Sequence, residues 1–269
     1  DNGLGFSSGS IFIIAALVMI ISSFIVYFSI RLKDSIQFEE ENIDVPMPSL
    51  SDLPQLLRRS YLIFLIALIF INFGRNSIAV ITGLFLSEPT AFGATGEEIA
   101  LYSNVGSIAS MIMGVLIGSL IAKTDDNKVL FVGVLLPITG ISWLILTPTF
   151  ALSLIASFLI GASQVVIQSS SYSIVAEMAP EKYRGRLFAY YNTTFFLSWG
   201  IAATLVTGPV ADILIANGVI VADAYRGSFI AAIALLIIGI IILIGYIRYT
   251  RSIGLFAKQV EIEKEFGDE

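Results

Sequence analysis

The 269-residue sequence contains no cysteine and no histidine. Without cysteine, the chain has no disulfide framework, no thiol nucleophile and no thiolate metal site. Without histidine, it also lacks the most common general base and the most common metal ligand of proteins. No phosphate-binding loop and no paired carboxylates inside the apolar segments are present either. We therefore predict that the protein is not an enzyme and that it holds no metal ion and no cofactor.

Charge is scarce as well. Only 13% of the residues are charged, which is about half the fraction found in a typical soluble domain. The formal net charge is -6, and no basic stripe is present that could neutralise phosphates, so nucleic acid is not an expected partner. Hydrophobic residues make up 56% of the chain and form runs long enough for spanning helices. The composition predicts an all-α polytopic helix bundle in a lipid bilayer.

The apolar runs predict one span at residues 10–32 and, after a polar linker at 33–59, a six-helix domain at 60–250. The linker carries an acidic run at 39–41 and three prolines, and it is the only long predicted loop. A polar tail follows at 251–269. The six later spans are expected at 60–86, 98–122, 128–147, 150–176, 186–214 and 226–249.

The distribution of lysine and arginine predicts how the chain is oriented. Thirteen of these residues flank the spans on the side of the linker, and Arg226 is the only one on the other side. Cytoplasmic loops carry an excess of lysine and arginine, so the linker and the C-terminus are expected in the cytoplasm. The N-terminus of the chain is then expected outside, and the plasma membrane is the expected location.

The segment 114–128, GVLIGSLIAKTDDNK, joins two of the predicted spans through a short polar turn. Gly114 and Gly118 share one helix face, where small residues let a neighbouring helix come close. The segment resembles the signature loop Gly-x-Leu-x-Asp-Arg-x-Gly-Arg-Arg of the major facilitator superfamily through Gly118, Leu120, Lys123 and Lys128. It departs from that pattern where Ala122 replaces the acid and where residues 125 and 126 are aspartates.

A second segment, APEKYRGR at 179–186, is similar to the cytoplasmic loop before the eleventh helix of that family. Gly200 and Gly208-Pro209 then interrupt the apolar run of the following span, as small residues often do in that helix of the family. One span, a long linker and six spans resemble the back half of such a twelve-helix transporter, beginning at its sixth helix. The resemblance implies that the N-terminal half, a natural partner of this chain, is missing. A chain that begins at Asp1, with an N-terminus outside, fits that expectation.

Arg75 is the only cation expected deep inside a span. Burying an arginine there costs about 2.5–3.5 kcal/mol on insertion scales, so it should face a cavity or a partner. Asn72 and Asn76 occupy the same polar sector of the helix. The family resemblance places this helix at the central cavity, which makes all three residues candidates for substrate binding. The alternative is a structural arginine paired with carbonyl groups or with a carboxylate of another helix.

No aspartate or glutamate is expected near the middle of a span, so the counter-charge of Arg75 is either on a missing half or on the substrate. Gln164 and Gln168 lie four residues apart in the span that resembles the tenth, cavity-lining helix of the family. Their amides can bind a polar substrate or can bond to a neighbouring helix, and both interpretations remain open. Trp199 can stack on a ligand or serve as an interfacial anchor.

Charged residues at the cytoplasmic ends are candidates for a gate that closes the inward side. The resemblance implies this role for Lys123, Asp125, Glu177 and Arg184, and a solvated rim is the alternative. Asn192 lies closer to the cytoplasmic side and is assigned to gating or packing ahead of binding. The predicted function is transport of a small polar or anionic solute by alternating access between two six-helix halves. A membrane sensor or accessory subunit that binds a ligand without moving it is the alternative.

Overall fold

The computed structural model describes residue 17 and residues 20–24, 53–180 and 183–254. The chain divides into two units, Asp1–Met47 and Pro48–Glu269. In the first unit the described residues are helical. The remainder of the span predicted at 10–32, the linker through residue 52 and most of the tail lie outside the described residues.

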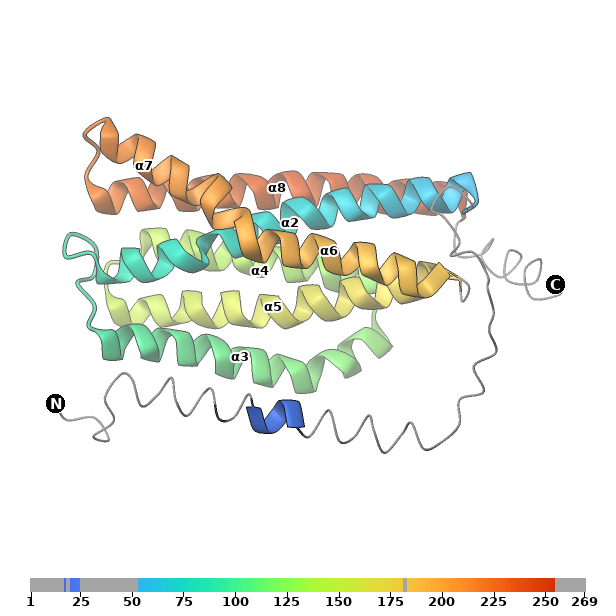
Figure 1. Cartoon of the computed structure of the whole chain (residues 1–269), viewed down its shortest axis with the longest axis horizontal. Helices are drawn as coiled ribbons and strands as arrows, with labels where there is room; N and C mark the ends of the chain where they lie inside the picture. The colour runs from blue at the N-terminus through green and yellow to red at the C-terminus, as the bar shows by residue number, and fades with distance from the viewer. Residues whose placement is uncertain (1–16, 18–19, 25–52, 181–182, 255–269) are drawn as a thin grey trace. The chain divides into compact units, whose positions relative to one another are not determined.

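The second unit is built from helices α2 to α8 (Figure 1). Six of its helical stretches are long and apolar enough to cross a membrane, and their bounds lie within five residues of the six predicted spans. The described part of the chain contains no strand, so the predicted all-α polytopic bundle is confirmed. The elements are α2 (Gln55–Ser87), α3 (Gly96–Lys123), α4 (Asp126–Leu146), α5 (Phe150–Met178), α6 (Arg184–Ala202), the π-helical turn η3 (Ala203–Thr207), α7 (Gly208–Ala216) and α8 (Val221–Ile253).

Local sequence signals account for several helix ends. The hydroxyl of Thr95 accepts a hydrogen bond from the Glu98 amide, and Glu98 in turn accepts from the Thr95 amide, so a capping box starts α3. The side chain of Asp125 accepts a hydrogen bond from the Asn127 amide and caps α4. Gly254 follows α8 with a φ of 60°, a left-handed conformation that glycine adopts without strain.

The helices form two sets with equivalent packing, the first made of α2, α3 and α4 and the second of α5, the broken helix α6–α7 and α8. Helix α2 packs along α8 and α6, whereas α5 packs along α4 and α3, and α4 contacts α8 (Figure 1). The main contacts made by α2–α4 thus have counterparts made by α5–α8, with α2 matching α5, α3 matching α6 and α4 matching α8. The two sets run in opposite directions, because α2 begins at the end of the bundle where α5 stops. This arrangement is that of two inverted three-helix repeats, with α2 and α5 at the centre.

Glycine permits the closest approaches between these helices. A Cβ atom added to Gly161 of α5 would overlap the backbone of Gly106 in α3. At the same crossing the Ser110 hydroxyl donates a hydrogen bond of 2.8 Å to the Gly161 carbonyl oxygen. On the other side of the bundle, a Cβ at Gly74 would lie 2.8 Å from the Ala232 carbonyl oxygen of α8. The two central helices are therefore held at backbone contact with their neighbours, as small residues allow in membranes.

The close approach predicted at Gly114 and Gly118 is not made by any described helix. A Cβ at either position would meet nothing within 4 Å, and both glycines are exposed on α3. Helix α3 buries only Tyr102, Ala109 and Ile117 among the described residues. Most of its remaining surface is apolar and exposed, because α3 contacts its neighbours along a single narrow face.

The span predicted as one helix at 186–214 is broken in the middle. The Gly208 amide donates to the carbonyl oxygen of Ala203, five residues back, which widens one turn into a π-helix. Proline at 209 has no amide hydrogen and cannot continue a regular ladder. The Thr207 hydroxyl donates to the Ser77 carbonyl oxygen, and the Ser228 hydroxyl donates to the Thr207 carbonyl oxygen at 2.7 Å. The break is thus fixed to α2 and α8, and α7 departs from the direction of α6 (Figure 1).

The two ends of the bundle differ in charge. We call the end where α2, α4 and α6 begin the basic end, and the opposite end the far end. Of the lysines and arginines that the structure describes, the far end holds only Arg226, and Arg75 lies inside the bundle. The basic end holds Arg58, Arg59, Lys123, Lys128, Arg184, Arg186, Arg248 and Arg251.

The Gly161 crossing yields a stability prediction. Gly161→Ala forces α3 and α5 apart, because the added methyl group meets backbone atoms of Gly106 that cannot rotate away. We expect the melting temperature in detergent or nanodiscs to fall, by an amount that corresponds to about 1–3 kcal/mol. Gly245→Ala on α8 is the matched control, because a Cβ there meets nothing within 4 Å. Equal melting temperatures for the two variants would contradict the proposed role of this crossing.

Candidate substrate-binding cavity

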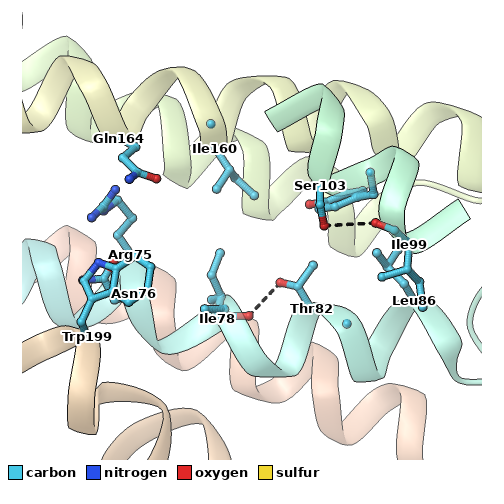
Figure 2. A pocket seen from close by; sticks show the side chains of 14 residues that line it. Arg75, Asn76, Ile78, Thr82, Leu86, Ile99, Ser103, Ile160, Gln164 and Trp199 are labelled. Carbon is cyan, nitrogen blue, oxygen red and sulfur yellow. Dashed lines mark hydrogen bonds between the residues drawn. The ribbon is translucent and has the colours of Figure 1, made fainter. Parts of the chain in front are cut away.

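A cavity of about 440 Å³ lies between α2, α3, α5 and α6 (Figure 2). Helix α2 lines it with one face, on which Arg75, Ala79, Thr82, Gly83 and Leu86 follow each other at helical spacing. The volume is within the range of pockets that bind small molecules. The cavity extends from the level of Arg75 toward the far end, where α2 stops and α3 begins.

Arg75 is the charged group of the cavity. Only 6% of its surface is exposed, and its Nε atom has no hydrogen-bond partner among the described residues. Its guanidinium carbon lies 5.8 Å from the centre of the Phe195 ring on α6, a distance at which an arginine is attracted to an aromatic face. Across the residues that the structure describes, no carboxylate forms an ion pair with Arg75. The site therefore holds a buried positive charge with unused donor capacity.

Gln164 brings a second polar group to the same place from the opposite central helix. Figure 2 shows its amide and the guanidinium of Arg75 pointing toward one another across one end of the cavity. The amide makes no hydrogen bond within the described part of the protein, so its donors and its acceptor are free for a ligand. Trp199, 61% exposed on α6, forms the adjoining wall together with Asn76. This end of the cavity is polar, and we call it the polar end.

Asn72 and Asn76 connect α2 to α6. The Asn76 amide donates a hydrogen bond of 2.7 Å to the Ser198 hydroxyl, and the Asn72 amide lies 3.5 Å from the Thr194 hydroxyl. The two asparagines are four residues apart on α2, and their two partners are four residues apart on α6. The two hydrogen bonds therefore lie one helical turn apart, as successive rungs between the helices. Asn76 also lines the cavity, whereas Asn72 lies only at a narrow gap beside Arg75. These asparagines position α6, and Asn76 is the one placed to reach a ligand in the cavity.

Gln168 lies beside the narrow gap rather than in the cavity itself. The gap joins it to Asn72, Arg75 and Gln164, so the structure brings all five residues predicted to bind substrate into one neighbourhood. The Tyr191 hydroxyl donates to the Gln168 carbonyl oxygen at 3.2 Å, which ties α6 to α5 next to the gap. Gln168 thus marks the side of the site that faces the basic end.

Several lining residues were not predicted as site residues. Thr82, Gly83 and Leu86 follow Arg75 on the same face of α2, and helical periodicity from Arg75 could have identified them. Tyr102 and Ser103 come from the first turns of α3. No local signal in the sequence shows that this turn packs beside the middle of α5, since the crossing at Gly106 and Gly161 is a tertiary feature.

The residues predicted to form a gate lie toward the basic end. One of them, Asp125, forms an ion pair there with Arg251, which was not among the predicted gate residues. An oxygen of Asp125 is 3.5 Å from the guanidinium of Arg251 on α8, and both side chains are exposed, that of Asp125 to 38%. Lys123 ends α3 and Arg184 begins α6, and both are exposed. Glu177 and Asn192 are exposed as well; Glu177 lies in the last turn of α5 and Asn192 in the third turn of α6. Arg251 was not predicted, because it lies in the segment expected to be a polar tail.

Comparison with known families identifies the chain. The sequence model of the Major Facilitator Superfamily matches residues 4–203, which is well over half of the chain. No match was found among curated proteins. Members of this family are secondary transporters of the membrane rather than enzymes, and they bind small-molecule substrates within the membrane. The six apolar helices agree with an integral membrane protein. The chain therefore belongs to the major facilitator superfamily.

Proposed function

We propose that this chain is the C-terminal half of a secondary transporter that moves a small polar or anionic solute by alternating access. The observation that carries the proposal is the buried Arg75 at a cavity between α2, α3, α5 and α6, without a carboxylate partner in the described ranges. A cation inside a spanning segment is costly unless a partner neutralises it. A substrate anion supplies that partner during each transport cycle.

Arg75 is the central binding residue in this proposal. Its planar guanidinium offers paired donors that match a carboxylate or another oxyanion. Asn76 and Gln164 complete the coordination at the polar end, because both line the cavity beside Arg75. Asn72 and Gln168 border the narrow gap on the other side of Arg75 and receive the substrate as it leaves toward the basic end.

The partner in this proposal is an N-terminal six-helix half. The largely apolar outer faces of α3 and α6 leave side chains such as Met111, Val115, Phe196 and Trp199 exposed in the described structure. A second bundle packed on these faces encloses the cavity. Rocking of one bundle against the other then opens the cavity to each side of the membrane in turn.

Gating in the proposed cycle takes place at the basic end. Asp125, Lys123, Glu177, Arg184 and Asn192 lie on α3, the start of α4, α5 and α6, which are elements that the rocking motion displaces relative to the partner half. The Asp125–Arg251 ion pair ties the start of α4 to the end of α8 within one bundle. In this proposal, charged helix ends of this bundle that pair with the partner half in one arrangement favour it over the other and so set the inward-closed state.

The proposed location is the plasma membrane, with the basic end in the cytoplasm. Eight lysines and arginines gather at that end in the described residues, against one at the far end, and this imbalance supports the orientation. The N-terminus of the chain is then outside, and the C-terminus is cytoplasmic. Flux separates this proposal from a sensor that binds a ligand without transport. In proteoliposomes that hold the chain together with its N-terminal half, accumulation of a labelled anion supports a transporter, and binding without accumulation supports a sensor.

Substitution of Arg75 tests the binding site directly. Arg75→Lys keeps the charge but loses the planar fork, so the affinity for small carboxylates such as succinate and benzoate should fall about tenfold. Arg75→Gln removes the charge and should weaken binding by about a hundredfold or more. Affinity and melting temperature are measured side by side in nanodiscs. A lowered melting temperature with unchanged affinity would assign Arg75 to the scaffold.

The two tryptophans of the chain make ligand binding visible. Trp199 lines the cavity, whereas Trp143 on α4 donates a hydrogen bond of 2.9 Å to the Leu152 carbonyl oxygen away from it. An anion bound beside Arg75 should therefore change the emission of Trp199. We expect the fluorescence response to survive in Trp143→Phe and to vanish in Trp199→Phe. A response that follows Trp143 instead would place the ligand outside this cavity.

Cysteine labelling tests the orientation, and the chain has no native cysteine to interfere. Thr124→Cys lies at the α3–α4 turn of the basic end, and Thr90→Cys lies in the loop after α2 at the far end; both positions are exposed. We expect a membrane-impermeant maleimide to label Thr90→Cys on intact cells and Thr124→Cys only after lysis. Labelling of Thr124→Cys on intact cells would reverse the proposed topology.

A further inference from the structure

The cavity is chemically asymmetric along its length. Its polar end carries Arg75, Asn76 and Gln164, and the remainder reaches along α2 as far as Leu86 (Figure 2). Leu86 lies eleven positions after Arg75, which corresponds to about 16 Å along a helix axis. We call the part beyond the level of Ile78 the apolar arm, since Leu86, Ile99 and Ile160 line it.

Hydroxyl groups beside the apolar arm are already engaged within their own helices. The Thr82 hydroxyl donates to the Ile78 carbonyl oxygen at 2.8 Å, and the Ser103 hydroxyl donates to the Ile99 carbonyl oxygen at 3.1 Å (Figure 2). The remaining hydroxyl, that of Tyr102, is shielded from solvent and makes no hydrogen bond to a described residue. No charged side chain lines the arm. Apart from this one hydroxyl, the arm therefore presents mainly hydrocarbon to a ligand.

We infer that the substrate is an amphiphilic anion, whose oxyanion binds at Arg75 and Gln164 and whose hydrocarbon part lies in the apolar arm toward the far end. This inference rests on the proposed function, because it assigns a substrate class to the same site. A fully hydrated solute such as a sugar or a dicarboxylate leaves the arm unfilled. A hydrocarbon in the arm gains the free energy of apolar burial on top of the charge interaction at Arg75.

Gly83 provides a way to fill the arm without disturbing the fold. It lines the cavity, and a Cβ added there meets nothing within 4 Å. Gly83→Leu therefore occupies space intended for the hydrocarbon part while leaving Arg75, Asn76 and Gln164 unchanged. Gly83→Val is a smaller second variant for the same purpose. Gly245→Leu is the matched control, because Gly245 is a helical glycine with open space that does not line the cavity.

The experiment measures the binding of butyrate, hexanoate and octanoate to the full chain in nanodiscs, with Trp199 emission in a Trp143→Phe background as the readout. Affinity should rise about fourfold for each methylene group that the arm buries. Gly83→Leu should remove this gain and leave butyrate within about twofold of the parent protein, whereas Gly245→Leu should change neither. Octanamide, which has the same chain without the charge, should bind at least tenfold more weakly than octanoate.

The outcomes separate this inference from the proposed function. If Arg75→Gln leaves the whole carboxylate series unaffected, or if no member binds, both fail. If Arg75→Gln abolishes binding but affinity is independent of chain length, the binding site stands and the amphiphilic substrate is wrong. A chain-length effect that persists in both Gly83→Leu and Arg75→Gln reports partitioning into lipid and also overturns the inference. Octyl sulfate and octyl phosphate, measured alongside octanoate, identify which oxyanion the polar end prefers.

Discussion

Backbone contact at glycine holds this bundle together. In a bilayer, lipid is as apolar as a leucine side chain, so helices associate through close packing and hydrogen bonds rather than through the hydrophobic effect. The crossing of Gly106 and Gly161 brings α3 against α5, and Gly74 and Gly239 bring α2 against α8. Three of these helices, α2, α3 and α5, also form walls of the cavity. The shape of the cavity therefore depends on glycine contacts between helices, some of which lie outside the cavity.

Polar side chains in the bundle serve two different purposes. Asn72, Asn76, Thr207 and Ser228 form hydrogen bonds between helices, and these bonds fix the positions of α6 and α7 around α2. Arg75 instead lies within the bundle with an unsatisfied Nε and an aromatic neighbour. A buried hydrogen-bond donor without a partner lowers the stability of the fold. Such a group is therefore expected where a ligand supplies the missing hydrogen bond. This contrast is the physical basis for proposing that Arg75 binds substrate and that the asparagine rungs are mainly structural.

The inverted arrangement of the two three-helix sets explains why the site lies where it does. Helices α2 and α5 occupy equivalent central positions, and both contribute polar groups to the same level of the bundle: Arg75 and Asn76 from α2, and Gln164 from α5. The outer helices α4 and α8 complete the packing and contribute no residue to the cavity. The regularity is broken in α6, where the π-helical turn and Gly208-Pro209 change the direction of the helix. Sites at the interface of such repeats are typical of secondary transporters.

The sequence by itself determined the helical class, the six spans to within five residues, the family and the charge asymmetry between the two ends. These features depend on local composition and spacing, because a run of apolar residues must form a helix in a bilayer to satisfy its backbone. It also singled out Arg75, since a lone charge in an apolar run is visible without a fold. Only the tertiary structure decided that Gly161 rather than Gly114 makes a close crossing, that the Asn76 amide bonds to Ser198, and that the first turns of α3 line the cavity. Those outcomes depend on how each helix is rotated about its own axis, and so on which of its faces meets a neighbour. Residues far apart in the chain determine that rotation together.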